Sequence, residues 1–421
     1  MEKIEKIVIN GQKRLKGSVN ISGAKNAAVA IVPAAIASGG IVTIDNLPHI
    51  EDVVNLAAAV RNLGAECEFK DKHTMVIDAR HVSGRSLAYN LAKNMRASYY
   101  FLGSLLGRFK EAYVPLPGGC NLGTRPYDYH LKGFTALGAT CKQEHGVLSV
   151  KADRLIGAPI YLDCPSAGAT INIMIAAVFA EGLTTIENAA KEPHVVDTAN
   201  FLNKLGARIG GAGTNVIRIH GVKELGSGEY TVIPDPIEAG TYMIASAITS
   251  GDVTVENIIP RHLYSLTAKL REMGCIIEET GDSIRVRRES DLKACDIKTN
   301  FYPGFPTDLQ PQMATLLCLA NGSGHITENV FEHRFQYVSE LKRLGADLRV
   351  SGRTATTRGF CEYTGAEVAA TDLRCGAALV IAGLAARGET TIGNLTHIDR
   401  GYESFEQKLV DLGADIKRVQ M

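Results

Sequence analysis

The residues best suited to chemistry lie in a short segment rich in glycine and proline. Cys120 follows Pro117-Gly118-Gly119 and stands five positions before Arg125. A partly exposed thiol beside a cation has a lowered pKa and therefore more of the nucleophilic thiolate. Cys275 and Cys318 instead fall on apolar faces of expected helices, where a thiol packs as a small hydrophobic group. Cys120 is the candidate reactive thiol.

Cations stand at the start of three apolar stretches that should form helices. These cations are Lys25, Arg96 and Arg374. A helix N-terminus has free N–H groups and the positive end of the helix dipole, so it attracts anions and opposes a cation. Three opposing cations at equivalent positions predict a shared anionic ligand. Asp308 begins an equivalent helix, where its carboxylate suits a helix cap or a general base directed at the same centre.

Ser166-Ala167-Gly168 begins another apolar stretch. Serine is a preferred helix cap and the N–H groups behind it suit a phosphate, so both interpretations stay open. Arg334 and Arg400 each follow a segment with a histidine, and either arginine taken singly is typical of a surface charge. The histidines have no metal-ligand spacing, and no GxGxxG or Walker A motif occurs, so we expect neither a metal nor an organic cofactor.

Six copies of one unit must position these residues. A glycine that follows a leucine or methionine recurs at intervals of 74, 68, 68, 71 and 68 residues, at Gly64, Gly138, Gly206, Gly274, Gly345 and Gly413. This regularity predicts six structural repeats. An amphipathic stretch before each glycine predicts a helix, and the glycine suits the left-handed conformation that ends one.

Each repeat also has a stretch that is apolar on all sides and leads to a strand with alternating polarity. Examples are 27–37, 170–180, 241–248, 314–320 and 377–386. A helix without a polar face belongs inside a domain. The sequence therefore predicts an α/β fold with buried helices and outer sheets, and six repeats most simply form two domains of three.

The second repeat departs from this pattern. From the glycine that opens its strand to the recurring glycine it has 31 residues, against 23 to 25 in four other repeats. The surplus is the segment 115–126, which contains Cys120. Loops inserted into a repeat architecture often carry function, so this segment is the first place to expect chemistry.

The composition excludes several classes of protein. The 421 residues suffice for two or three domains, and the 45 basic and 45 acidic side chains cancel, unlike those of a general nucleic-acid binder. The apolar stretches are too short to span a bilayer, and the N-terminus has no signal-peptide pattern. Nine irregularly spaced cysteines without a CxxC pair disfavour a disulfide framework. We expect a cytoplasmic protein without membrane insertion; its oligomeric state stays open.

Taken together, these residues resemble the UDP-N-acetylglucosamine 1-carboxyvinyltransferase family. The matching segments span the chain, and they are 23–26, 96–98, 116–120, 125–126 with Asp128 and His130, 305–308, 370–374 and 397–403. The loop that contains Cys120 beside Arg125 is specific to this family, whereas the sixfold repeat is common to a wider superfamily. The resemblance implies two inside-out, barrel-like α/β domains, 24–234 and 1–23 plus 235–421, with the active site in the cleft between them.

The resemblance also implies an activity. A member of this family transfers the enolpyruvyl group of phosphoenolpyruvate to the 3′-hydroxyl of UDP-N-acetylglucosamine and releases phosphate, in the first committed step of peptidoglycan synthesis. The reaction proceeds by addition and elimination through a tetrahedral ketal, without a metal or organic cofactor. Phosphoenolpyruvate carries a phosphate and a carboxylate, which explains the need for several cations. An epoxide phosphonate of the fosfomycin type is expected to alkylate Cys120.

Residue roles follow from the same resemblance. Cys120 is expected to act as general acid toward the methylene carbon, and Asp308 to accept the proton of the sugar hydroxyl, with Lys25 and Arg400 also catalytic. Residues expected to bind phosphoenolpyruvate are Lys25, Asn26, Arg125, Arg334, Arg374 and Arg400. Residues expected at the nucleotide sugar are Asn26, Arg96, Arg125, Pro126, Tyr127, Asp128, Tyr129, Cys164, Pro165, Ser166, Ala167, Gly168, Asp308 and Val330.

Two other functions are alternatives to this one. The sister 3-phosphoshikimate 1-carboxyvinyltransferase shares the repeats and phosphoenolpyruvate but is not expected to carry the cysteine loop. A non-catalytic paralogue that only binds a nucleotide sugar should have lost a catalytic residue, and none is lost here. Pro236, His194 and His333 stand where the family usually has arginine, glutamate and asparagine, which affects the sugar site or domain closure rather than the reaction.

Overall fold

The computed structural model of the chain describes residues 5–93, 95–116 and 127–420. The contacts among these residues form two compact units. One unit contains 23–116 and 127–233, and the other contains 5–22 and 234–420. The N-terminal segment therefore belongs with the C-terminal half of the chain. No helix within the described ranges is long and apolar enough to cross a membrane.

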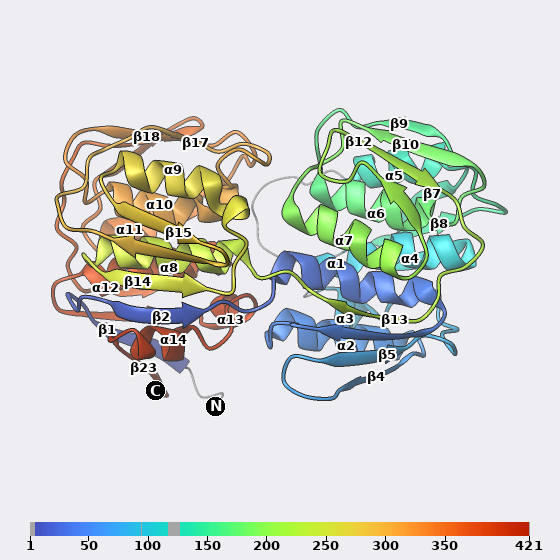
Figure 1. Cartoon of the computed structure of the whole chain (residues 1–421), viewed down its shortest axis with the longest axis horizontal. Coiled ribbons are helices and arrows are strands. Elements are labelled where there is room, and N and C mark those ends of the chain that lie inside the picture. The colour runs from blue at the N-terminus through green and yellow to red at the C-terminus, as the bar shows by residue number, and fades with distance from the viewer. Residues whose placement is uncertain (1–4, 94, 117–126, 421) are drawn as a thin grey trace. The chain divides into compact units, whose positions relative to one another are not determined.

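The unit of residues 23–233 has three sheets on its outside and helices inside (Figure 1). Its elements are α1 (Lys25–Ala35), η1 (Ile36–Ser38), β3 (Ile41–Asp45), α2 (Glu51–Asn62), β4 (Glu66–Phe69), β5 (Met75–Asp78), α3 (Tyr89–Ala92), η2 (Arg96–Tyr99), α4 (Tyr100–Phe109), β6 (Glu111–Pro115), α5 (Asp128–Ala136), β7 (Thr140–Glu144), β8 (Val147–Lys151), β9 (Pro159–Tyr161), α6 (Ala167–Ala177), β10 (Leu183–Glu187), α7 (Pro193–Lys204), β11 (Arg208–Gly210), β12 (Val216–His220) and β13 (Gly228–Thr231). The strand orders are β13-β3-β5-β4, β11-β12-β10-β9 and β6-β8-β7.

The unit that contains residues 234–420 repeats this plan. Its elements are β1 (Glu5–Asn10), β2 (Lys16–Asn20), α8 (Pro236–Ile248), β14 (Asp252–Glu256), η3 (Pro260–Leu263), α9 (Tyr264–Glu272), β15 (Ile276–Thr280), β16 (Ser283–Arg287), β17 (Ile297–Lys298), η4 (Thr307–Leu309), α10 (Gln310–Leu317), β18 (Gly324–Thr327), η5 (Arg334–Tyr337), α11 (Val338–Arg343), β19 (Leu348–Ser351), β20 (Thr354–Thr357), β21 (Glu367–Ala369), α12 (Leu373–Ala385), β22 (Glu389–Gly393), α13 (Thr396–Asp399), α14 (Phe405–Asp411) and β23 (Asp415–Gln420). The strand orders are β21-β22-β1-β23, β15-β16-β14-β2 and β17-β18-β20-β19.

The apolar helices form the cores of the two units. In one unit α4 packs against both α1 and α6, and in the other α8, α10 and α12 pack against one another. All residues of α6 from Ala169 to Ala177 are buried, so this helix has no polar face. The prediction of buried helices and outer sheets, three repeats to a unit, is confirmed. Each of the described sheets is open, so neither unit is a closed barrel over those residues.

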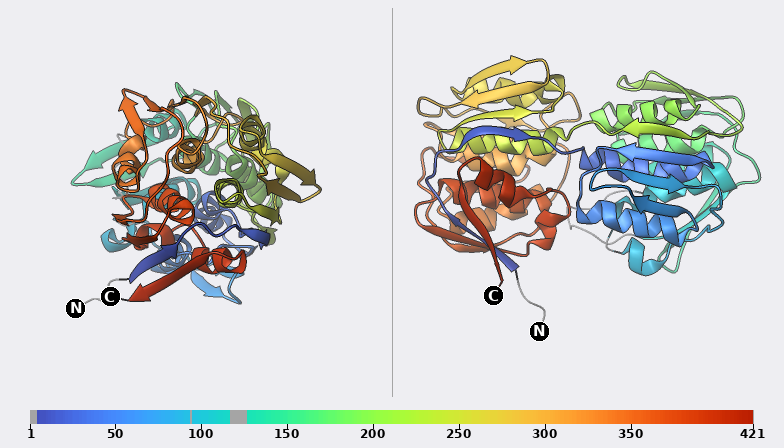
Figure 2. Two further views of the ribbon diagram at one scale, coloured as in Figure 1. Left: turned by 90° about the vertical axis from the view of Figure 1, so that its left-hand side faces the viewer. Right: turned by 60° about the horizontal axis from the view of Figure 1, so that its bottom comes forward.

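The N-terminal strands complete two sheets of the second unit. β1 runs antiparallel to both β22 and β23, with Ile7 opposite Ile392 and Arg418, and β2 runs parallel to β14 (Figure 2). In sheets such as β17-β18-β20-β19, the strand next to β18 comes from the same repeat as β18. In the sheet β21-β22-β1-β23, the N-terminal strand β1 takes that position next to β22. The residues that precede α1 therefore fold with the end of the chain.

The six recurring glycines end helices as predicted. They follow α2, α5, α7, α9, α11 and α14, and their φ angles run from 94° to 110°. A side chain at such a φ clashes with the backbone, which explains why glycine recurs at this position. The spacing pattern therefore marks the point in each repeat where the amphipathic helix turns into the outer sheet.

An asparagine ends the first long strand in four of the repeats. Asn46, Asn188, Asn257 and Asn394 all have φ between 54° and 59°. In each, Nδ2 donates to a carbonyl oxygen of a neighbouring segment at 2.8 to 3.3 Å. Asparagine is one of the few residues that tolerate this left-handed conformation, and its amide adds the hydrogen bond. The side chain thus ties each strand end to the adjacent chain.

We predict that Asn188→Ala lowers the free energy of unfolding by about 1–3 kcal/mol, since alanine loses the hydrogen bond to Leu162 and resists a positive φ. Asn188→Gly should cost less, because glycine keeps the conformation and loses only the bond. Urea denaturation measures both effects. Asn90→Ala, on an exposed position of α3, is the matched control and should be neutral. Equal stability of Asn188→Ala and Asn90→Ala would contradict this account.

Candidate active site

Asp308 lies between two arginine side chains of the second unit. Its Oδ1 is 3.2 Å from Nη2 of Arg334, and its Oδ2 is 3.0 Å from Nη2 of Arg374. Both guanidinium groups are buried, whereas the carboxylate is 26% exposed. Two cations withdrawn from water are strongly destabilising unless an anion faces them. These two arginines, both expected to bind phosphoenolpyruvate, therefore converge in this structure on the carboxylate of Asp308.

The start of α12 determines where Arg374 lies. Asp372 caps this helix, and its Oδ1 accepts hydrogen bonds from the N–H groups of Arg374 and Cys375 at 2.8 and 3.1 Å. Burial lowers the pKa of Arg374, but the charges of Asp308 and Asp235 and the contact with Tyr402 together outweigh burial, so the pKa lies above its ordinary value. The guanidinium is therefore held protonated in the protein interior.

A buried polar network behind Arg374 was missed by the sequence analysis. Nη1 of Arg374 donates to Oη of Tyr402 at 3.4 Å, and this oxygen is 2.8 Å from Oγ1 of Thr241. Nε2 of Gln312 donates to both oxygens at 3.3 Å. Burial raises the pKa of Tyr402, so its phenol stays neutral and donates a hydrogen bond. Tyr402 lies in a segment that matches the family, but no sequence pattern connects it with Thr241 or Gln312.

Arg334 has a buried donor to spare. Its side chain is 2% exposed, and its Nε has no hydrogen-bond partner among the described residues. Buried guanidinium donors without an acceptor are uncommon, and they suit an acceptor supplied by a ligand. Arg334 begins η5, directly after a loop that contains Val330. The sequence named Arg334 as a candidate for binding phosphoenolpyruvate, but it gave no indication that the side chain is buried.

Glu328 shapes the loop that precedes Arg334. Its Oε1 accepts hydrogen bonds from the N–H groups of Val330 and Phe331 at 2.8 and 2.9 Å, and its Oε2 accepts one from the hydroxyl of Thr307 at 3.0 Å. Glu328 is buried, and Thr307 is the neighbour of Asp308. One carboxylate thus joins the predicted sugar-site residue Val330 to the segment of the predicted base. Glu328 is a positioning residue that the sequence analysis missed.

Arg400 is half-buried at the end of α13. Burial, and then the positive charge of Arg400, lower the pKa of His397 on the same helix. The neighbouring Asp399 binds Arg418 with two hydrogen bonds of 2.6 and 3.0 Å, and Arg418 also binds Glu406 and Glu5. This ion-pair network links α13 to α14, β23 and β1, and so determines where Arg400 lies.

Lys25 is the first residue of α1, in the unit of residues 23–233. Its Nζ is 3.0 Å from Oδ2 of Asp52 in the first turn of α2, and both side chains are largely buried. Asp52 offsets the unfavourable dipole at Lys25, so the cation has an internal partner that the sequence analysis did not identify. The only signal was the pair Glu51-Asp52 at the start of an amphipathic stretch. Asn26, the next residue of α1, is half-buried.

Ser166 caps α6. Its Oγ accepts a hydrogen bond from the N–H of Ala169 at 3.3 Å, which decides the role of this hydroxyl in favour of capping. Within the described part of the chain, no hydrogen bond is made by the N–H groups of Ala167 and Gly168. These two backbone donors stay available at the positive end of the helix dipole, as a phosphate requires.

His130 joins α5 to the middle of α6. Its Nδ1 is 3.0 Å from Nδ2 of Asn172, and Nδ2 also donates to the carbonyl of Tyr99 at 2.8 Å. Oδ1 of Asn172 accepts from the N–H of Gly103, so the amide is fully bonded. Burial lowers the pKa of His130 to about 4. A neutral imidazole that accepts at Nδ1 agrees with this network. Asn172 was missed because it lies within an apolar stretch.

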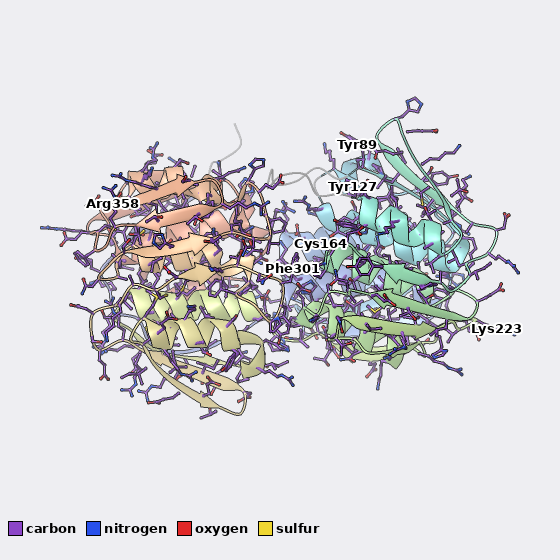
Figure 3. All side chains as sticks on the ribbon, turned by 90° about the horizontal axis from the view of Figure 1, so that it is seen from above. Tyr89, Tyr127, Cys164, Lys223, Phe301 and Arg358 are labelled. Carbon is purple, nitrogen blue, oxygen red and sulfur yellow. The ribbon has the colours of Figure 1, made fainter. Side chains whose placement is uncertain are left out.

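The remaining candidates of this unit lie at the starts of helices. Arg96, which begins η2, is half-buried, as are Tyr127, Tyr129, Cys164 and Pro165, whereas Asp128 is exposed. Figure 3 shows Tyr127 and Cys164 on the same side of their unit. Burial raises the pKa of Cys164, which disfavours a thiolate there. Cys120, Arg125 and Pro126 lie outside the described residues.

The three departures from the family pattern have ordinary surroundings. Pro236 is the first residue of α8, behind the cap Asp235, where proline is favourable. His194 lies in the first turn of α7 and is half-buried, and His333 is exposed before η5. Over the described ranges, no group of three or more His, Cys, Asp or Glu side chains is placed to hold a metal ion.

Inner helices surrounded by outer sheets, with cations and backbone donors at the helix starts, define the class of enolpyruvyl transferases. The solved structure of the enolpyruvyl transferase NikO from Streptomyces tendae has a TM-score of 0.90 with this chain, at 28% identity over the whole of both chains. Residues 9–409 match the family described as EPSP synthase (3-phosphoshikimate 1-carboxyvinyltransferase). The expected fold class is therefore confirmed.

Curated relatives narrow the assignment within that class. UDP-N-acetylglucosamine 1-carboxyvinyltransferase 3 of Caldanaerobacter subterraneus subsp. tengcongensis is 57% identical over 99% of this chain and 100% of its own length. UDP-N-acetylglucosamine 1-carboxyvinyltransferase 2 of Bacillus subtilis (strain 168) is 52% identical over 99% of this chain and 97% of its own length. The chain belongs to the UDP-N-acetylglucosamine 1-carboxyvinyltransferase family. The resemblance stated from the sequence motifs is confirmed.

We predict that His130 makes stability sensitive to acid. Its pKa is about 4 in the folded protein and about 6.5 in a free side chain, so the unfolded chain binds more protons between these values. Stability should therefore fall as the pH is lowered through this range, by about 3 kcal/mol from this group.

Denaturant unfolding of wild type and His130→Asn at several pH values tests this prediction. Asparagine keeps an oxygen that can accept the hydrogen bond from Asn172 but has no proton to bind. The buried carboxyl of Asp197 titrates with the opposite sign, its pKa being raised to about 6, and is common to both proteins. The difference between the two plots of unfolding free energy against pH therefore gives the contribution of His130 alone. Parallel curves would refute the prediction.

Proposed function

We propose that this chain transfers the enolpyruvyl group of phosphoenolpyruvate to the 3′-hydroxyl of UDP-N-acetylglucosamine and releases phosphate, the first committed step of peptidoglycan synthesis. The observation that carries this proposal is the buried pair Arg334 and Arg374 on the carboxylate of Asp308. Two guanidinium groups buried around a carboxylate are a site for the carboxylate of a substrate. The names of the close relatives supply the acceptor sugar.

In this proposal, Asp308 exchanges partners as the substrate binds. The carboxylate of phosphoenolpyruvate takes over hydrogen bonds that Arg334 and Arg374 make to Asp308 in the present structure. Asp308 then loses the two cations that stabilise its ionised form, so its carboxylate becomes a better proton acceptor. Substrate binding and activation of the base for the sugar hydroxyl are thereby coupled. Glu328, through Thr307, keeps the segment of Asp308 in place during this exchange.

The remaining steps use the other predicted residues. Lys25, Arg125 and Arg400 bind the phosphate, with Asp52 holding the ammonium group of Lys25. The sugar oxygen forms a bond to C2 of the enol as Asp308 takes its proton and Cys120 protonates C3, which gives the tetrahedral ketal. Elimination then breaks the C2–O bond to phosphate as a proton leaves C3 for the thiolate of Cys120, and the departing phosphate takes the proton held by Asp308. Each proton that enters in the addition step is thus accounted for when product leaves.

We propose that residues at the helix starts bind the nucleotide sugar. The free N–H groups of Ala167 and Gly168 suit a diphosphate, and Arg96 supplies a cation. The proposed partners comprise Asn26, Arg125 to Tyr129, Cys164 to Gly168, Asp308 and Val330. In this proposal, residues of both predicted domains, 24–234 and 1–23 plus 235–421, bind the same two substrates. We place the protein in the cytoplasm, since its eight described cysteines are free thiols, as a reducing compartment requires.

We predict that phosphate release from phosphoenolpyruvate requires UDP-N-acetylglucosamine, and that Cys120→Ser lowers turnover by about 10²–10⁴-fold, the usual contribution of a general acid. A coupled phosphate assay measures both. Cys141→Ser, at a half-buried thiol with a raised pKa, is the control and should retain activity. Release with shikimate 3-phosphate alone would favour the sister enzyme, and no release with either acceptor would favour a non-catalytic paralogue.

We predict that Asp308→Asn separates binding from turnover. Asparagine removes the negative charge that competes for Arg334 and Arg374, so the dissociation constant of phosphoenolpyruvate should fall several-fold while kcat falls by about 10²-fold or more. Calorimetry and steady-state kinetics measure the two effects. Asp347→Asn, at an exposed and loosely paired aspartate, should change neither. Weaker binding by Asp308→Asn would contradict the proposed exchange.

A further inference from the structure

Cys318 and Cys361 lie side by side in the second unit and are not among the residues assigned to catalysis. Cys318 follows α10 directly, and Cys361 lies on the connection between β20 and β21. The N–H of Cys361 donates to the carbonyl oxygen of Cys318 at 2.9 Å. This backbone bond holds two distant segments of the chain together and makes the two cysteines direct neighbours.

The two thiols lie close enough to change each other's ionisation. The neighbouring thiol of Cys318 lowers the pKa of Cys361, whereas the thiol of Cys361 and burial both raise the pKa of Cys318. The pair therefore contains one thiol that ionises readily and one that keeps its proton. A more acidic attacking thiol beside a protonated second thiol is the arrangement found in redox-sensitive cysteine pairs.

The surface reaches only one member of the pair. Cys318 is fully buried, whereas Cys361 is half-buried and lines a surface pocket of about 890 Å³. The pocket is also lined by charged side chains of both signs, among them Arg288, Arg387, Asp291 and Glu362, so it is polar enough to admit a small hydrated molecule. A small polar oxidant can therefore reach the sulfur of Cys361 from solvent, and Cys318 only through it.

The other described thiols of this unit have neither a lowered pKa nor access to the surface. Cys275, Cys295 and Cys375 are buried, and burial raises the pKa of each to about 11. At neutral pH such thiols contain very little thiolate and react slowly. Among the described thiols of this unit, an oxidant should therefore react first with Cys361.

We propose that Cys318 and Cys361 form a modification site, which a hydroperoxide converts into an intramolecular disulfide. The thiolate of Cys361 attacks the peroxide, so that an S–O bond forms, the O–O bond breaks, and the leaving oxygen takes a proton to become water or an alcohol. The sulfur of Cys318 then attacks the sulfenic acid, forming the S–S bond, while the S–O bond breaks and hydroxide leaves as water with the proton of Cys318. The two thiols lose two electrons and the peroxide gains them.

This inference is independent of the proposed function, because neither cysteine belongs to the catalytic set. The disulfide closes the part of the chain that carries Arg334. A cross-link of this kind restricts the unfolded chain more than the folded one. Oxidation is therefore expected to stabilise the unit that contains 234–420 without touching the residues that bind substrate.

Peptide mapping tests the proposal. The full-length reduced protein is treated with a small excess of hydrogen peroxide, blocked with N-ethylmaleimide, digested with trypsin without reductant and analysed by mass spectrometry. Each cysteine lies in a separate tryptic peptide, 299–334 and 359–374, with no second cysteine in either. We expect these peptides to be joined, with loss of two hydrogens, and to separate on addition of dithiothreitol. The same treatment in guanidinium chloride should abolish this selectivity.

Two variants and a control complete the test. Cys361→Ser should leave Cys318 unoxidised, and Cys318→Ala should leave a sulfenic acid on Cys361 that dimedone traps. Cys295→Ala, at a buried thiol whose pKa is raised to about 11, should form the cross-link at the wild-type rate. Oxidation of Cys361 in wild type without the cross-link, a cross-link to a different cysteine, or two reduced thiols after Cys120 is fully oxidised would each overturn the proposal.

Discussion

The structure depends on one electrostatic constraint: guanidinium groups buried in a protein must face an anion. Arg334 and Arg374 are both largely removed from water, and Asp308 binds one with each carboxylate oxygen. Tyr402, Gln312 and the capped start of α12 then determine the position of Arg374. A substrate carboxylate can replace the protein carboxylate without exposing either cation, which makes an exchange of partners a natural way to couple binding to proton transfer.

The repeat architecture explains why such residues occur at so many places in the chain. In each repeat an apolar helix lies inside its unit, so the only polar positions that it offers are at its ends. Lys25, Ser166, Asp308 and Arg374 all lie at or just before the start of an inner helix. The internal partner Asp52 makes it possible for a cation to occupy one of these starts. The fold thus supplies equivalent positions at the starts of the inner helices, and the side chain at each position determines its chemical role.

Much of the architecture was predictable because it has a local cause. The recurring glycines, such as Gly274 with φ of 96°, meet a backbone requirement that a few neighbouring residues create. The inner helices were predictable because they lack a polar face. The asparagines at the strand ends escaped notice, since their role depends on a carbonyl from another segment. Asn188, for example, bonds to Leu162, and nothing in either residue's neighbours along the chain indicates this contact.

The sequence by itself determined the sixfold repeat, the glycine-ended helices, the family and the set of charged residues that lie near helix starts, because each is encoded in spacing or in a short motif. Only the tertiary structure decided which charges meet. It placed Asp52 on Lys25, assigned the hydroxyl of Ser166 to capping, and brought Asp308 to two arginines. It also placed Glu328 behind Val330 and Cys361 against Cys318. Such pairs join segments far apart in the chain, and their partners are selected by burial and packing, which no local pattern records.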